Sequence, residues 1–218
     1  MAKRKKQQGG NQQGKSGGRR NALREKAAQQ RRRQNRVIGG IAGAALLLIG
    51  VVVYLQVRDR LPAFGEQVLT SQGNSHIDFG TVSPITYNST PPTSGPHYGN
   101  IMAWRIYDEP QRYEHLVHNL EDGGVVIWYQ CPEGCPEILA ELRDIVQPYL
   151  DRGEHVVLAP NEPTWSIDGG APLHKDMEAT IAITAWQRIL KMDEVDAEMI
   201  RAFIERFEGL DHHVPGIS

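Results

Sequence analysis

Residues 117–136 read VHNLEDGGVVIWYQCPEGCP and combine an apolar run, a histidine near carboxylates, and both cysteines of the chain. The run Val125–Tyr129 predicts a buried strand, because it is short, apolar, and rich in β-branched and aromatic residues. Pro136 suits the first position of a helix, where its missing N–H costs nothing. The apolar residues that then fall on one helical face are Ile138, Leu139, Leu142, Ile145 and Val146. A strand, a cysteine-bearing junction and an amphipathic helix are therefore expected here.

The flanking sequence extends this pattern in both directions. Val156–Ala159 predicts another short strand, ended by Pro160, and Ile181–Trp186 predicts a third. A final helix is expected from about Asp196. Its apolar side consists of Ile200, Phe203, Ile204 and Phe207. Residues 61–110 are rich in Gly, Pro, Ser, Thr and Asn, which favours loops and brief strands. The expected fold class is α+β, with helices packed on a small mixed sheet.

An uncharged apolar run, Val37–Leu55, precedes this domain. As a helix rising about 1.5 Å per residue, it would match a bilayer core of about 30 Å. We therefore predict a transmembrane helix at residues 37–57. A cleaved signal peptide is the main alternative, but the apolar run is long for one and no A-x-A-like site follows it.

Charge is distributed unevenly about that run. Residues 1–36 hold thirteen Lys and Arg and one acid, Glu25, whereas the rest of the chain holds eleven basic and twenty-five acidic residues. The positive-inside bias predicts that residues 1–36 form a disordered basic tail in the cytoplasm and that residues 58–218 form an extracytoplasmic domain. The tail could contact anionic lipid or nucleic acid, or only set the topology. The acidic outer domain has no basic stripe, so nucleic-acid binding is not expected there.

Two motifs resemble the domain of unknown function 3105 family. The first is Pro91-Pro-Thr-Ser-Gly-Pro-His97-Tyr98, and the second is Val117-His-Asn-Leu-Glu121 followed by Gly123-Gly-Val-Val-Ile. Ala185-Trp186 in the third expected strand also fits, and the resemblance covers most of residues 64–210. The family commonly has His where this chain has Asp122. The resemblance implies a membrane-tethered extracytoplasmic domain and names no reaction.

A second resemblance is local. Cys131-Pro-Glu-Gly-Cys135-Pro136 is similar to the Cys-Pro-x-x-Cys-Pro segment that Sco-type copper chaperones place between a strand and a helix. It implies copper chemistry and a fold that is thioredoxin-like in part. Three uses of the cysteines stay open: a structural disulfide, which is common outside the cytoplasm, metal ligation, and thiol redox chemistry at a helix start that lowers a thiol pKa.

Three histidines are the other candidates. His97 lies in a rigid Pro/Gly loop, His118 shortly precedes the first strand, and His76 also fits the family pattern. Three imidazoles with Glu121 or Asp122 would suit zinc or copper. Taken singly, each histidine is more often a hydrogen-bonded structural residue. The pair His212-His213 could bind metal adventitiously, but it is interpreted as part of a solvated tail.

These observations give one leading hypothesis. The protein would be a membrane-tethered, extracytoplasmic, transition-metal binding or accessory protein, with copper preferred over zinc. Catalysis is less expected, because no pair of nucleophile and base is evident. The predicted metal ligands are His76, His97, His118, Glu121, Asp122, Cys131 and Cys135. The alternatives are a thiol–disulfide oxidoreductase using the cysteines, and a non-enzymatic scaffold domain. The expected partners are the lipid bilayer and an envelope protein.

Overall fold

The computed structural model describes residues 14–58 and 63–213, and the chain divides into two compact units, residues 1–59 and 60–218. In the first unit, helix α1 (Gly14–Arg58) contains a candidate membrane span, Gln29–Tyr54, with a mean hydropathy of 2.5. The side chains of this span are exposed. The protein thus has an N-terminal helix that is long and apolar enough to cross a membrane.

Helix α1 begins earlier than the sequence predicted. Residues 14–36, which we expected to be disordered, are helical and continuous with the apolar span. This segment contains no proline and is rich in Ala, Gln, Arg and Lys, which all have good helix propensity. Once the apolar span has formed a helical nucleus, extension of the helix into these residues adds one hydrogen bond per residue. The expectation for residues 1–13 lies outside the described residues.

The second unit is built on a five-stranded sheet. Its strand order is β1 (Gln67–Val68), β7 (Arg188–Met192), β6 (Ile181–Ala185), β4 (Val125–Tyr129), β5 (Val156–Pro160). β4 and β5 are parallel, whereas the other neighbours are antiparallel. The sheet is therefore mixed, and the α+β prediction is confirmed.

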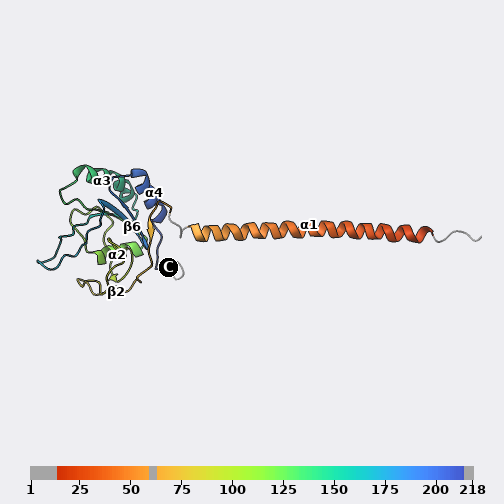
Figure 1. Ribbon diagram of the computed structural model, residues 1–218, viewed down its shortest axis with the longest axis horizontal. Helices are drawn as coiled ribbons and strands as arrows, with labels where there is room; N and C mark the ends of the chain where they lie inside the picture. Colours follow the sequence, from red (N-terminus) through yellow and green to blue (C-terminus); the bar gives the residue numbers. More distant parts are fainter. Residues whose placement is uncertain (1–13, 59–62, 214–218) are drawn as a thin grey trace, which may run out of the picture. The chain divides into compact units, whose positions relative to one another are not determined.

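Helices cover both faces of this sheet. α3 (Pro136–Asp151) and α4 (Ala197–Phe207) lie on one face, and α2 (Tyr113–Glu121) lies on the other (Figure 1). Side chains alternate along β4, so that Val125 and Ile127 pack with α3 and α4, while Val126 and Trp128 pack with α2. Because β4 is buried on both faces, its sequence is a continuous apolar run.

The order of elements places the cysteines at the end of the central strand. β4, α3 and β5 form a crossover between parallel strands, and the antiparallel hairpin β6–β7 and helix α4 follow. The elements from β4 to α4 thus form a β–α–β unit followed by a β-hairpin and a helix. Cys135 is the N-cap residue of α3 and Pro136 opens the helix, as the sequence predicted.

A second, smaller sheet supports the histidines. β2 (His76–Ile77) pairs in parallel with β3 (His97–Tyr98), and His76 lies opposite His97 in the register. The segment that leads into β3, residues 91–98, is buried throughout. Its Ser94 hydroxyl accepts a hydrogen bond from the backbone N–H of Gln72 at 3.0 Å. This loop is thus part of the interior and holds β3 in a fixed position.

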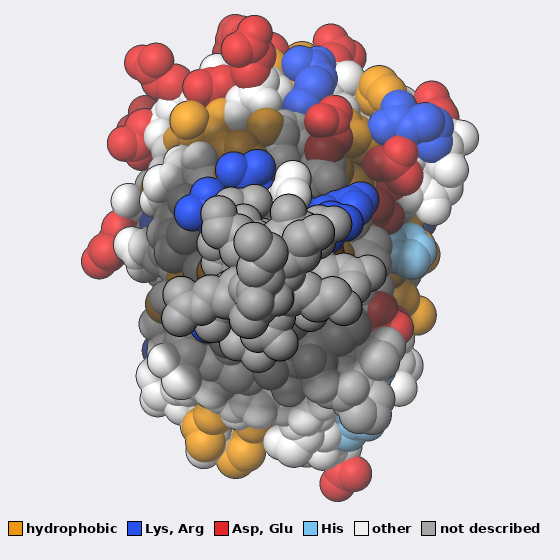
Figure 2. All heavy atoms as spheres, turned by 90° about the vertical axis from the view of Figure 1, so that its right-hand side faces the viewer, with side chains coloured by type: hydrophobic (Ala, Val, Ile, Leu, Met, Phe, Trp, Pro, Cys, Tyr) orange, Lys and Arg blue, Asp and Glu red, His pale blue; other side chains and the backbone are white. Residues whose placement is uncertain are grey.

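The surface of the second unit is acidic over α3 and α4. In Figure 2, acidic side chains gather along the upper edge, the side on which Figure 1 places these helices. The exposed acids of the two helices are Glu137, Glu141, Asp144, Asp151, Glu198 and Glu205. The negative charge of this face would repel a phosphate backbone.

Candidate metal centre

The candidate centre starts from the short motif His118-Asn-Leu-Glu121 in α2. His118 and Glu121 are three residues apart, so they lie on the same side of the helix. Leu120 points to the core instead. The amide of Asn119 binds both backbone groups of Met102, accepting at 3.0 Å and donating at 2.9 Å. The motif therefore fixes α2 with two residues and presents the other two to the centre.

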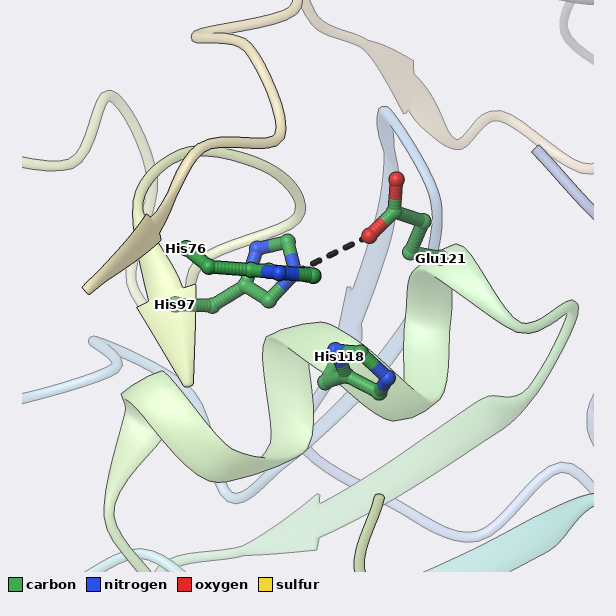
Figure 3. A group of neighbouring side chains, drawn as sticks. All are labelled: His76, His97, His118 and Glu121. Atoms are coloured by element: carbon green, nitrogen blue, oxygen red, sulfur yellow. Dashed lines mark ion pairs between the residues drawn. The ribbon is translucent and has the colours of Figure 1, made fainter. Parts of the chain in front are cut away.

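β2 and β3 bring the other two imidazoles to this side of α2. Figure 3 shows His76 and His97 projecting from their paired strands toward His118 and Glu121 on the helix. Ring centroids are 5.0 Å apart for His76 and His97, 5.3 Å for His76 and His118, and 5.1 Å for His97 and His118. Three rings from three elements thus converge on one place.

The potential ligand atoms converge as well. One atom from each of His76, His97, His118 and Glu121 lies within 4.8 Å of the corresponding atom of every other residue in the group. His97 and Glu121 are buried, His118 is 8 % exposed, and His76 is exposed. The group is therefore a buried cluster with one side open to solvent.

The pair His97 and Glu121 shows the chemistry of the cluster most clearly. His97 Nδ1 lies 2.8 Å from the backbone oxygen of Gly95, which can only accept, so Nδ1 carries a proton. In the neutral ring Nε2 then has a lone pair. Nε2 lies 2.9 Å from Glu121 Oε2, another acceptor. Two buried acceptors face each other at a distance that requires a proton or a cation between them.

Neighbouring residues orient the remaining atoms of the cluster. The amide of Asn74 donates to Glu121 Oε1 at 2.7 Å, which leaves Oε2 directed at the imidazoles. Among the described residues, His97 Nε2, His118 Nδ1 and Glu121 Oε2 are buried without a hydrogen-bond partner. Native proteins rarely leave buried polar atoms unpaired. Three such atoms in one cluster form an arrangement that a bound cation or an added proton could satisfy.

Burial favours neutral imidazoles here. Desolvation lowers the pKa of His97, opposed by its bond to Gly95 and by the charge of Glu121. It also lowers the pKa of His118, opposed chiefly by Asp122. At neutral pH both rings are therefore neutral, with one nitrogen of each free to donate a lone pair, which is the state in which histidine ligates a metal.

Asp122 belongs to an adjoining group. Asp122, His118 and His213 also present ligand atoms within 4.8 Å of one another. His213 Nε2 lies 3.2 Å from Glu121 Oε2. His213 is exposed, as the expectation of a solvated tail implied, but the chain after α4 returns to the end of α2 and brings this imidazole next to Glu121. Only the fold brings these residues together, and the adjacent histidines His212 and His213 were the one local sign of a possible metal ligand.

The cysteines are not part of either group. Cys131 and Cys135 are joined to each other in the structure, with their Cα atoms 5.7 Å apart. Neither contributes an atom to the two metal-ligand groups found among the described residues. The predicted ligands thus separate into a histidine–carboxylate cluster at α2 and a disulfide at the start of α3.

The other histidines have ordinary structural contacts. His155 stacks on Trp104, with ring centroids 4.6 Å apart, and His115 packs against Tyr98. His174 is buried, donates from Nε2 to the backbone oxygen of Gln111 at 2.7 Å, and accepts from the backbone N–H of Glu162. These three histidines thus have packing or hydrogen-bond roles and lie outside the two metal-ligand groups.

Comparison with known proteins gives a family and no activity. No curated protein and no solved structure matches the chain. A protein family described as "Protein of unknown function (DUF3105)" matches residues 79–216, which is more than half of the 218 residues. The matched region includes His97, His118, Glu121 and His213, and it begins three residues after His76. The chain therefore belongs to the DUF3105 family.

Proposed function

We propose that this protein binds one divalent transition-metal ion through His76, His97, His118 and Glu121. The observation that carries the proposal is the set of buried, unpartnered atoms His97 Nε2, His118 Nδ1 and Glu121 Oε2. A cation would accept electron pairs from all of them and would remove the repulsion between His97 and Glu121. Protein metal ligands are commonly supported in this way, with the other ring nitrogen bound to a carbonyl, as His97 is to Gly95.

A protonated His97 is the competing explanation. A proton on Nε2 would also satisfy Glu121 Oε2 at 2.9 Å. It would leave His118 Nδ1 without a partner among the described residues, and desolvation lowers the pKa of His97, which opposes this state. A cation accounts for both buried imidazoles at once, so it is the better explanation.

The donor set favours copper or zinc. Imidazole nitrogens suit both metals, and a carboxylate completes a four-coordinate set. For a given nitrogen and oxygen site, Cu²⁺ is bound more tightly than Zn²⁺, so copper is our first choice. The exposure of His76 supports an accessory or carrier role, since one ligand of the centre can be reached from solvent. Together with the N-terminal span and the positive-inside bias, this suggests metal handling at the outer surface of a membrane.

Equilibrium dialysis of the full-length protein in detergent tests the proposal. Protein freed of metal is dialysed against Cu²⁺ or Zn²⁺ and bound metal is measured by elemental analysis. We expect one ion per chain. His76→Ala should weaken binding by tenfold or more without loss of fold, because this side chain is exposed. His97→Ala and Glu121→Gln should weaken binding further.

His155→Phe is the matched control, because it keeps an aromatic ring on Trp104 and lies outside both groups. It should bind metal as the wild type does. If folded wild-type protein takes up neither copper nor zinc, or if His76→Ala and His97→Ala bind as tightly as the wild type, the metal proposal is wrong.

A second candidate function is thiol–disulfide exchange by Cys131 and Cys135. The observation in its favour is the position of Cys135 as the N-cap of α3, at the end of the central strand. A helix start stabilises a thiolate there and so favours redox chemistry. The reduction potential decides the matter. A value well above about −300 mV supports exchange, whereas a lower value marks a structural disulfide.

A further inference from the structure

We propose that His213 is an additional ligand of the same ion and that the segment Gly209–His213 closes over the metal centre. This inference rests on the proposed function. It adds a ligand that arrives from the carboxyl-terminal end of the domain, and it predicts that metal binding and the order of this segment are coupled.

The imidazole of His213 lies next to the carboxylate of Glu121. His213 Nε2 lies 3.2 Å from Glu121 Oε2, the oxygen that also faces His97 Nε2 at 2.9 Å. The rings of His118 and His213 have centroids 5.8 Å apart. Two imidazole nitrogens from distant parts of the chain therefore point at a single carboxylate oxygen.

Two neighbouring carboxylates fix the tautomer of His213. Its Nδ1 lies 3.1 Å from a carboxylate oxygen of Asp211 and 3.1 Å from one of Asp122. Ionised carboxylates only accept, so Nδ1 carries a proton. In the neutral ring Nε2 then offers a lone pair toward Glu121. This is the carboxylate–histidine arrangement that orients metal-bound imidazoles in proteins.

Backbone hydrogen bonds attach the segment Gly209–His213 to the end of α2. Gly209 N–H donates to the backbone oxygen of Gly123 at 2.8 Å, and His212 N–H donates to that of Glu121 at 2.9 Å. A Cβ atom on Gly123 would lie 2.9 Å from backbone atoms of Leu210. Gly123 thus gives the segment its close approach, and the hydrogen bond from His212 places His213 next to Glu121.

His213 is more exposed than the carboxylate that it faces. The side chain of His213 is 40 % exposed, whereas that of Glu121 is 1 % exposed. His213 can therefore leave the centre without unfolding the domain, and so can admit or release the ion. A bound ion would link this segment to α2 and β3. It would thereby stabilise the hydrogen bonds that the N–H groups of Gly209 and His212 donate to Gly123 and to α2.

One ion explains the two groups better than two ions. Both groups contain His118, and His213 reaches Glu121 as well as Asp122. A second ion would have to share His118 or Glu121 with the first. A single ion needs no shared ligand, and it leaves Asp122 as an acceptor that orients His213.

The test compares His213→Phe with His212→Phe in the full-length protein in detergent. His212 stacks on Trp186 and contributes no atom to either metal-ligand group, so phenylalanine there keeps an aromatic contact. Affinity for Cu²⁺ and Zn²⁺ is measured by competition with a chelator. Hydrogen exchange of residues 209–213 is measured with and without metal.

We expect one ion per chain in the wild type and in both variants. His213→Phe should lower the affinity at least about tenfold, as loss of a group that supports a metal commonly does. His213→Gln, which keeps a polar side chain, should behave like His213→Phe. Metal should slow exchange in residues 209–213 of the wild type and of His212→Phe, but not of His213→Phe.

Three results would overturn the inference while leaving the proposed function standing. These are two ions bound per wild-type chain, unchanged affinity in His213→Phe, or exchange in residues 209–213 that metal does not slow. If wild-type protein binds no metal at all, the proposed function itself has failed, and the inference falls with it.

Discussion

The buried hydroxyl of Thr184 has both of its hydrogen-bond partners inside the core. It is fully buried on β6, accepts a hydrogen bond from the indole N–H of Trp128 at 3.0 Å, and donates to the backbone oxygen of Val126 at 3.2 Å. Its hydroxyl is therefore the partner of one of the largest buried side chains in the core.

Replacement of Thr184 by valine should be costly although the shape is kept. The indole N–H of Trp128 would lose its acceptor, and an unsatisfied buried donor costs about 1–3 kcal/mol. Chemical denaturation should show this loss in the free energy of unfolding. Thr70→Val, at an exposed position, should change it by less than about 0.5 kcal/mol. Equal effects of the two substitutions would contradict the role of the hydroxyl.

His174 predicts a dependence of stability on pH. Burial lowers the pKa of this histidine from 6.5 to about 4 in the folded protein. Between these values the unfolded chain binds a proton that the folded chain does not, so stability falls as pH decreases through this window. The shift corresponds to about 3 kcal/mol.

His174→Gln removes this titration, so the comparison isolates it. The difference in unfolding free energy between wild type and variant should be largest at pH 7 and should shrink by up to about 3 kcal/mol by pH 4. Denaturant unfolding with a chelator present measures it without interference from metal. A difference that stays constant over this range would show that His174 does not titrate as its burial implies.

Some residues of the candidate site could be predicted from the sequence, because they lie within short local motifs. His118 and Glu121 stand three apart in one motif, and His97 lies in a second motif with its own rigid loop. His213 could not be predicted, since its place depends on the path of the chain after α4. Its partners Glu121 and Asp122 are about ninety residues away in the sequence.

At the scale of elements, the sheet and two of its helices follow from apolar patterns. The expected strands and the helices that begin at Pro136 and near Asp196 are confirmed as β4, β5, β6, α3 and α4. Helix α2 was not predicted, because most of its residues are buried and several of these are polar, so no apolar stripe marks it. β7 was not predicted either. Its hairpin turns at Gln187, with φ +61°, where a glycine or asparagine would have signalled the turn.

The junction between β4 and α3 carries a prediction of its own. The double variant Cys131→Ser, Cys135→Ser should bind copper or zinc as tightly as the wild type, because neither cysteine belongs to the histidine–carboxylate cluster. Its stability should fall by at most about 2 kcal/mol, since a bridge over so short a loop removes little chain entropy. Dialysis and thermal unfolding measure the two effects. Loss of metal binding in this variant would place the cysteines in the centre.

At the scale of the whole molecule, the chain joins an apolar N-terminal helix to an acidic α+β domain. The span Gln29–Tyr54 could serve as an anchor or as a signal sequence. Thirteen basic residues before Val37 and the absence of an A-x-A-like site after Leu55 favour an anchor.

An anchor predicts that the N-terminus stays on the mature protein. Full-length protein with an N-terminal epitope, expressed in a bacterial host, should remain in the membrane fraction after carbonate extraction. Intact mass should include residues 1–36, apart from the initiating methionine. A mature chain that begins after about residue 57 and is released from the membrane would show a cleaved signal instead.

X-ray absorption spectroscopy of the zinc-loaded, full-length protein tests most directly whether the histidine–carboxylate cluster holds the metal. A zinc ion held by this cluster should show a first shell of nitrogen and oxygen at about 2.0–2.1 Å with outer scattering from imidazole rings. Substitution of His97 by alanine should reduce that imidazole scattering. A sulfur shell at about 2.3 Å would assign the metal to Cys131 and Cys135, and a shell without imidazole would contradict the histidine centre altogether.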